Sequence, residues 1–242
     1  MNRDSNGYTF GFAAAMVLVV ASVLAFTASS LKDLQAENVR KEKMQNILST
    51  IGIETDRDGA EKLFNTYITK QLALRNDGSV DNAVDAFSDI KLAIEVKKDA
   101  TEQRFPLYVA NVDTKTYYII PLRGAGLWNA IWGYIALNED KNSIKGVVFD
   151  HQGETAGLGA EITQQWFMNR FVDEKIFDTS GALVGINVSK TNNDPNDTDK
   201  NDHEVDAISG ATITGDGVSA MIVERLQHYL PYLKANDLAY NN

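Results

Sequence analysis

FPLYVA at residues 105–110 and TYYIIPL at residues 116–122 decide the fold class of this chain. Both runs combine aromatic with β-branched residues, a composition typical of β-strands. Two further runs, LWNAIWGYIAL at 127–137 and IKGVVFD at 144–150, have the same character. The polar sequence between them, residues 139–142, predicts a hairpin turn. We therefore expect a mainly antiparallel sheet at the centre of a domain.

Segments with helical spacing flank this strand-rich centre. Apolar residues recur every three or four positions over 217–234, which predicts a closing helix, and a shorter helix is expected over 164–172. On the N-terminal side, residues 31–51 and 58–74 are also predicted to be helical, since they are rich in helix formers with intermittent apolar positions. A last strand is expected over 183–188. The predicted fold class is α+β, with helices flanking the sheet.

The N-terminal stretch is apolar over the length of a membrane span. Residues 5–31 contain no Asp, Glu, Lys or Arg, and a helix over residues 8–28 is about 30 Å long, which matches the hydrocarbon core. A cleaved signal peptide is the alternative, with Ala28-Ser29-Ser30 as its cleavage site, but secretory apolar cores run only about 7–15 residues. We therefore favour an uncleaved, single transmembrane helix. The predicted domains are an anchor over residues 1–30, a juxtamembrane helical region over 31–104 and a soluble domain over 105–242.

Composition restricts the chemistry that this chain can perform. The 23 Lys and Arg residues against 33 Asp and Glu give a net charge of -10, which disfavours nucleic acid as a partner. The chain has no cysteine, so it forms no disulfide, no zinc–thiolate site and no Cys-ligated iron–sulfur cluster of its own. Its three histidines lack metal-ligand spacing, and we predict no metal site. Redox chemistry would therefore need an organic cofactor.

An acidic loop at 191–204 is the strongest alternative candidate for a metal site. Counted from Asp197, it has Asp202 where an EF-hand requires glycine and Ile208 where an EF-hand requires glutamate. We therefore expect a solvated surface loop.

Two glycine-rich segments follow predicted strands. Gly124-Ala-Gly-Leu-Trp128 lacks the third glycine of a dinucleotide-binding fingerprint, because Asn129 occupies its place. The plain interpretation is a turn between strands, with Trp128 and Trp132 as core aromatics. His151-Gln-Gly-Glu-Thr-Ala-Gly-Leu-Gly159 is the second segment, and its glycines allow the backbone to approach a planar ligand closely.

A third segment, Asp206-Ala-Ile-Ser-Gly-Ala-Thr-Ile-Thr214, stands just before the closing helix. In the simplest interpretation Thr214 caps that helix. Capping does not explain the small, hydroxyl-rich tetrapeptide at 209–212, whose donors near a helix N-terminus would suit a phosphate group.

These segments together resemble a known family. Ser209-Gly-Ala-Thr212, with Asp206 three residues before the serine, resembles the flavinylation motif of the FMN-binding domain family. Residues 151–159 are similar to a second signature of that family, His-x-x-Glu-Thr-Pro-Gly-Leu-Gly, with Ala156 in place of the proline. Residues 124–128 resemble the Gly-x-Gly-Leu-Trp segment of the C subunits of sodium-translocating NADH:quinone oxidoreductases. The resemblance covers nearly the whole chain.

The resemblance implies a covalent cofactor and its site. FMN would be joined through its phosphate to the Thr212 hydroxyl by a separate flavin transferase, since a threonine hydroxyl is a weak nucleophile without such a catalyst. Recognition and phosphate contacts would fall to Asp206, Ser209, Gly210 and Ala211. The residues implied to flank the isoalloxazine ring are Glu154, Thr155, Gly157, Leu158, Gly159, Leu127 and Trp128. Ala156 leaves the ring-side geometry open.

The function implied is that of an electron-transfer subunit. It would pass electrons between redox centres of a sodium-translocating NADH:ubiquinone oxidoreductase, together with the other subunits of that complex, and would be no complete catalyst alone. The resemblance places it in the bacterial inner membrane with its soluble domain in the periplasm. Two alternatives remain: a G-type subunit of the ion-translocating ferredoxin:NAD oxidoreductase complex, and an anchored binding domain without a cofactor.

Overall fold

A computed structural model describes residues 5–196 and 198–235 and divides the chain into two units, Met1–Lys43 and Met44–Asn242. The first unit is formed by helix α1 (Asn6–Ser49), which continues into the second unit. Along the predicted span almost all of its side chains are exposed, and the helix is long and apolar enough to cross a membrane. The structure therefore confirms one long apolar helix at the N-terminus.

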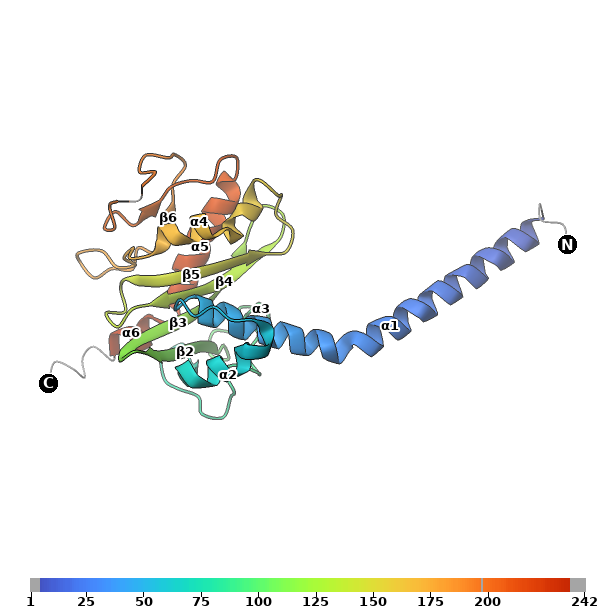
Figure 1. Cartoon of the computed structure of the whole chain (residues 1–242), viewed down its shortest axis with the longest axis horizontal. Helices are drawn as coiled ribbons and strands as arrows, with labels where there is room; N and C mark the ends of the chain where they lie inside the picture. The colour runs from blue at the N-terminus through green and yellow to red at the C-terminus, as the bar shows by residue number, and fades with distance from the viewer. Residues whose placement is uncertain (1–4, 197, 236–242) are drawn as a thin grey trace. The chain divides into compact units, whose positions relative to one another are not determined.

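The second unit is built on a five-stranded antiparallel sheet in which each strand pairs with the next along the chain (Figure 1). The strands are β1 (Ile68–Leu74), β2 (Phe105–Val112), β3 (Lys115–Ala125), β4 (Ala130–Leu137) and β5 (Ile144–His151). In the predicted turn between β4 and β5, the Asp140 carboxylate accepts the N–H groups of Asn142 and Ser143 at 2.9 Å each. The α+β fold with an antiparallel sheet is confirmed.

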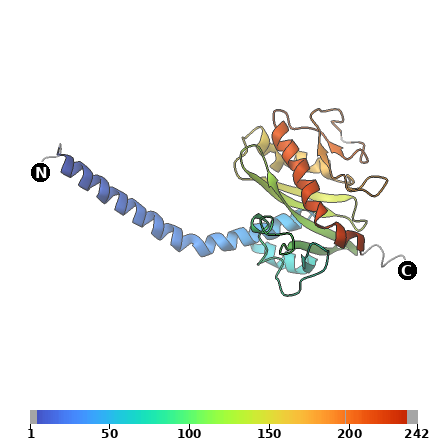
Figure 2. The same cartoon turned by 180° about the vertical axis from the view of Figure 1, so that it is seen from behind.

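Both faces of the sheet are covered by helices. Along β2 and β3, Leu107 and Ile120 belong to the core that α5 (Thr212–Gln227) shares, and Figure 2 shows α5 crossing that face. The intervening residues Tyr108 and Ile119 belong to a second core with α2 (Arg57–Tyr67) and the last turns of α1. Burial on both faces explains why these strands are almost continuously apolar.

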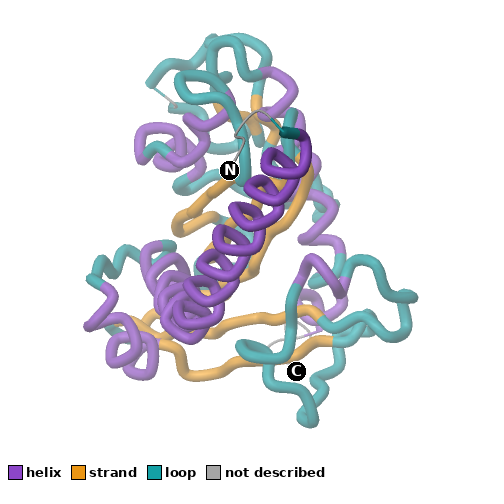
Figure 3. The backbone as a smooth tube through the Cα atoms, turned by 90° about the vertical axis from the view of Figure 1, so that its right-hand side faces the viewer, coloured by secondary structure: helices purple, strands orange, loops and turns teal. Residues whose placement is uncertain are grey.

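Between β5 and α5 the chain is mostly loop, drawn in teal in Figure 3. The short elements of this region are η1 (Gly159–Thr163), α4 (Gln165–Met168), η2 (Asn169–Phe171), β6 (Asn187–Val188) and β7 (Glu204–Val205). The helix expected over 164–172 is thus present as α4 followed by η2. The strand expected over 183–188 is reduced to β6, which pairs with β7 in parallel. A further short helix, α3 (Leu92–Glu95), precedes β2.

Two predicted helices have different bounds in the structure. The helix predicted over 58–74 ends at Tyr67, and its second half is strand β1, which pairs with β2. In a segment this short, the spacing of apolar residues suits either a helix or a strand, and pairing with β2 decides for the strand. The closing helix begins at Thr212, five residues before the predicted start at 217, and a separate helix α6 (Leu230–Ala235) follows it. Pro231 lies in the first turn of α6, where a missing N–H costs nothing.

Candidate functional site

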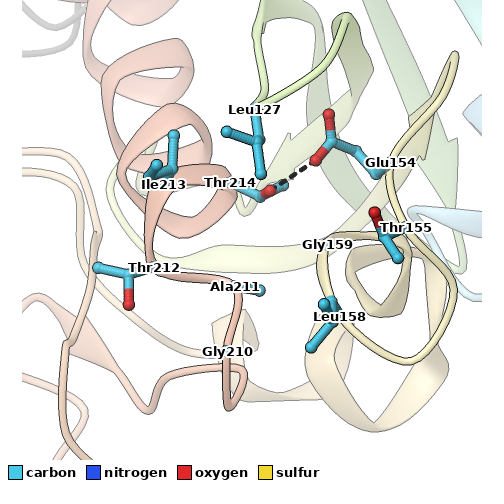
Figure 4. A pocket seen from close by; sticks show the side chains of 10 residues that line it. All are labelled: Leu127, Glu154, Thr155, Leu158, Gly159, Gly210, Ala211, Thr212, Ile213 and Thr214. Carbon is cyan, nitrogen blue, oxygen red and sulfur yellow. Dashed lines mark hydrogen bonds between the residues drawn. The ribbon is translucent and has the colours of Figure 1, made fainter.

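Three segments far apart in the sequence meet around one open pocket of about 230 Å³ (Figure 4). They are the turn after β3, the loop after β5 and the start of α5. The lining residues are Leu127, Glu154, Thr155, Leu158, Gly159, Gly210, Ala211, Thr212, Ile213 and Thr214. The structure thus brings together the three segments that the sequence singled out.

The carboxylate of Glu154 links all three segments. Glu154 is buried, with 7% of its surface exposed. One carboxylate oxygen accepts the Thr214 hydroxyl at 2.6 Å, and the other accepts the backbone N–H of Trp128 at 2.9 Å, with the N–H of Asn129 farther away at 3.5 Å. The Glu154 N–H itself donates to His151 Nδ1 at 3.2 Å.

These hydrogen bonds keep Glu154 charged. Burial by itself raises the pKa of the Glu154 carboxyl, but the Thr214 hydroxyl and the N–H groups of Trp128 and Asn129 favour the carboxylate. Together they bring the pKa of Glu154 below its ordinary value. The pocket wall therefore carries a fixed negative charge at neutral pH.

Two glycines leave the room that this carboxylate occupies. A Cβ at Gly126 would lie 2.6 Å from one carboxylate oxygen of Glu154, and a Cβ at Gly159 would lie 2.6 Å from the other. The Gly159 Cβ would also lie 2.5 Å from the Thr214 hydroxyl oxygen. The glycines of the turn and the loop are thus required by the close approach of Glu154 and Thr214.

The first turn of α5 lines the pocket and has no side-chain cap. The N-cap residue Ala211 provides no side-chain cap, and the N–H of Gly215 bonds to the Ala211 carbonyl at 2.9 Å. The N–H groups of residues 212–214 precede this first helical bond and lie at the positive end of the helix dipole. Thr212 is exposed beside them. The structure does not support the predicted capping role of Thr214, whose buried hydroxyl donates to Glu154 instead.

The pocket combines apolar side chains with the N-terminal turn of a helix. Leu127, Leu158 and Ile213 are 46%, 40% and 58% exposed, respectively, and offer apolar surface beside the donors of α5. Pockets that enclose a whole drug-sized ligand usually measure about 300–1,000 Å³. The smaller volume here implies that part of such a ligand stays exposed.

Four of the predicted site residues lie outside the pocket lining. Trp128 stands at the rim, 68% exposed, with its indole N–H donating to the Thr155 hydroxyl at 3.2 Å, so it is no core aromatic. Gly157 forms a turn at φ 75°, and Ser209 is exposed. Asp206 is buried and accepts the N–H groups of Asn193 and Asp194 at 3.0 and 3.3 Å, so its carboxylate organises the acidic loop.

The acidic loop has no metal-ligand cluster in its described part. Over 5–196 and 198–235, no group of three or more His, Asp or Glu residues is arranged to hold a metal ion. Asp197, from which the EF-hand pattern is counted, lies outside the described residues.

Comparison with known proteins shows the family of this chain. The model of the FMN-binding domain matches residues 126–227. Over 91% of both chains, the sequence is 31% identical to the C subunit of the Na(+)-translocating NADH-quinone reductase of Pseudomonas aeruginosa. The same subunit of Vibrio campbellii is 30% identical over 90% of this chain and 89% of its own. The chain belongs to the family of C subunits of the Na(+)-translocating NADH-quinone reductases.

Crystal structures from this C-subunit family have the same fold. That of the C subunit from Parabacteroides distasonis superposes with a TM-score of 0.75 at 38% identity and covers 84% of this chain and 96% of its own. NqrC of Shewanella oneidensis superposes with a TM-score of 0.66 at 26% identity and covers 81% of this chain and 98% of its own. The segment matched by the FMN-binding domain, 126–227, contains the whole pocket lining.

The sequence did not predict two residues that line the pocket, Ile213 and Thr214. Ile213 follows the motif directly, and an apolar residue in the exposed first turn of a helix could have indicated a ligand contact. The sequence alone favours a capping role for Thr214 because it predicts a later start of the helix. Thr212 and Thr214 are two residues apart, and this spacing shows that their side chains point in different directions only when the start of the helix is known.

Proposed function

We propose that this chain carries FMN joined covalently to Thr212 and passes electrons within a Na(+)-translocating NADH:quinone reductase. The observation that carries the proposal is the exposed Thr212 at the uncapped start of α5, on the rim of a pocket lined by all three motif segments. The names of the relatives and the FMN-binding domain model support it.

Different residues of the pocket would hold the phosphate and the ring of the cofactor. The N–H groups of the first turn of α5 would bind the phosphate, because a helix N-terminus favours anions. Leu127, Leu158 and Ile213 would pack against the ring, and the Thr155 hydroxyl is the polar group beside them. FMN supplies the capacity to accept and release electrons in a chain that has no cysteine thiols.

A covalent bond suits the open shape of this pocket. A cofactor that is only partly enclosed gains less binding energy from burial than an enclosed one. Openness also lets a redox partner approach the ring. A tether at Thr212 would therefore prevent dissociation without closing the route for electrons.

Attachment is a group-transfer reaction that needs a second protein. The Thr212 oxygen would form the bond to phosphorus, its proton would pass to a base of the flavin transferase, and the leaving group of an activated flavin phosphate donor would depart. Within residues 5–196 and 198–235, no hydrogen bond joins the Thr212 hydroxyl to a base, and a neutral hydroxyl is a weak nucleophile. The exposure of Thr212 makes it accessible to such an enzyme.

The family of the chain and helix α1 support a proposal for its location in the cell. We propose that α1 anchors the chain once in the bacterial inner membrane, with the soluble unit in the periplasm beside the other subunits of the complex. Membership in the C-subunit family favours the quinone reductase over a ferredoxin:NAD oxidoreductase and over a domain without a cofactor.

In-gel fluorescence of the denatured chain tests this proposal. Full-length protein is expressed with and without a flavin transferase, as native sequence, as Thr212→Ala and as Thr66→Ala. Thr66 is an exposed threonine in α2 and serves as the matched control. Fluorescence in the native and Thr66→Ala chains only with the transferase, and none in Thr212→Ala, is expected. A dark native chain in the presence of active transferase contradicts the proposal.

A further inference from the structure

We infer that Glu154 and Thr214 form a positioning pair that orients the first turn of α5 for attachment of FMN at Thr212. This inference rests on the proposed function and adds to it two residues that act through Thr212 and need not touch the cofactor.

The helical geometry of the first turn couples Thr214 to Thr212. Successive residues of an α-helix are rotated by about 100°, so side chains two apart point in nearly opposite directions. Thr214 is 1% exposed and points toward Glu154, whereas Thr212 is exposed and points away from it (Figure 4). Fixing the Thr214 hydroxyl to Glu154 at 2.6 Å therefore fixes the rotation of this turn and the direction of Thr212.

The acceptor of this hydrogen bond is itself held firmly. Glu154 receives the Trp128 N–H and donates its own N–H to His151. The missing side chains of Gly126 and Gly159 leave just the space that the carboxylate fills, since a Cβ at either position would come within 2.6 Å of it. Thr214 is thus bonded to a carboxylate that other hydrogen bonds and close packing hold in place.

The rest of α5 does not depend on this bond. Val218, Met221, Ile222 and Leu226 anchor the helix in the core. Its first turn has no side-chain cap at Ala211, so the Thr214 hydroxyl is the polar side-chain contact that restrains it. Loss of this contact should leave the helix folded and loosen the presentation of Thr212.

The test measures FMN incorporation into the full chain by purified flavin transferase in a single turnover. Thr214→Val keeps the shape and removes the hydroxyl, and Thr214→Ser restores it. Misplacing a reacting group by about 1 Å costs up to about a hundredfold in rate, and we expect Thr214→Val to slow incorporation at least about tenfold. The transferase concentration for half-maximal rate should not change, and Thr214→Ser should stay within about twofold of native.

Two controls separate positioning from general destabilisation. Thr66→Val makes the same chemical change at an exposed position of α2, where the hydroxyl bonds to the Lys62 carbonyl. Ile222→Val loosens the buried part of α5 itself. Both should incorporate FMN at the native rate. If Thr214→Val fails to fold, Glu154→Gln replaces it, and a rate below native is expected because the amide holds the Thr214 hydroxyl less strongly than the carboxylate does.

The outcomes are distinct. Native incorporation rates in Thr214→Val and Glu154→Gln, with none in Thr212→Ala, overturn the positioning pair and leave the proposed function intact. Equal slowing in Ile222→Val and Thr214→Val also overturns it, because stability alone would then explain both. A native chain that takes up no FMN overturns the proposed function and this inference together.

Discussion

Adding one methyl group at Gly159 should break the contact between Glu154 and Thr214. In Gly159→Ala the new Cβ would lie 2.5 Å from the Thr214 hydroxyl oxygen and 2.6 Å from a carboxylate oxygen of Glu154. Real Cβ atoms do not approach heavy atoms so closely, so one or both side chains must move. Both side chains are buried, so we expect this displacement to break the hydrogen bond between them.

The energetic cost can be estimated from that hydrogen bond. A hydrogen bond to a charged group contributes about 1.5–3 kcal/mol to stability. For a domain of this size, each kcal/mol lowers the melting temperature by about 2–4 °C. Gly159→Ala should therefore melt about 3–12 °C below the native chain.

Thermal melting of the full chain in detergent, followed by circular dichroism, measures this difference. Gly153→Ala is the matched control in the same loop, because its Cβ would meet only Asn129 Cβ at an ordinary distance of 3.9 Å. Alanine there should be neutral or slightly stabilising, by up to about 1 kcal/mol. A Gly159→Ala chain with the melting temperature of the native protein would refute the reasoning. The Glu154 carboxylate would then have space for a neighbouring methyl group, which the structure does not show.

Three further changes test other parts of the account. The folded-state pKa of Glu154 lies below its ordinary value, so the stabilisation by its carboxylate is present at neutral pH and is lost as pH falls through the folded-state pKa. The native chain should therefore melt at a higher temperature than Glu154→Gln at pH 7, and this difference in melting temperature should narrow below about pH 4. A difference that stays constant with pH would contradict stabilisation by the Glu154 carboxylate. Leu226→Ala removes a fully buried side chain of α5 and should cost about 2–5 kcal/mol in urea unfolding, whereas a cost under about 1 kcal/mol would show that α5 does not pack on the sheet as described. Trp128 is 68% exposed, against 44% for Trp166 and a half-buried Trp132. Trp128→Phe should therefore remove the tryptophan fluorescence that acrylamide quenches most strongly. Unchanged quenching would contradict the exposed position of the Trp128 indole.

The central strands and the hairpin turn were predictable because their composition and their turn residues are local properties. The runs at 105–110 and 116–122 became β2 and β3 with small changes in their bounds. Ile68–Leu74 was not predictable in the same way. Its spacing suits either a helix or a strand, and pairing with Phe105–Val112, more than thirty residues away, decides between them.

The candidate site was predictable as a set of segments but not as a geometry. Short motifs around Glu154 and Thr212 indicated which parts of the chain meet. The sequence does not show that α5 begins at Thr212, so the inward direction of Thr214 could not be read from it. The position of Asp206 was also not predictable from its motif. Its carboxylate accepts the N–H groups of Asn193 and Asp194, and the residue lies outside the pocket lining.

Tandem mass spectrometry of the peptide containing residues 206–214 tests the central claim most directly. This peptide holds three hydroxyl side chains, those of Ser209, Thr212 and Thr214, and of these only Thr212 lines the pocket with an exposed side chain. After expression with the flavin transferase, fragment masses should place the flavin phosphate on Thr212. A flavin on Ser209 or Thr214, or an unmodified peptide, would contradict the account.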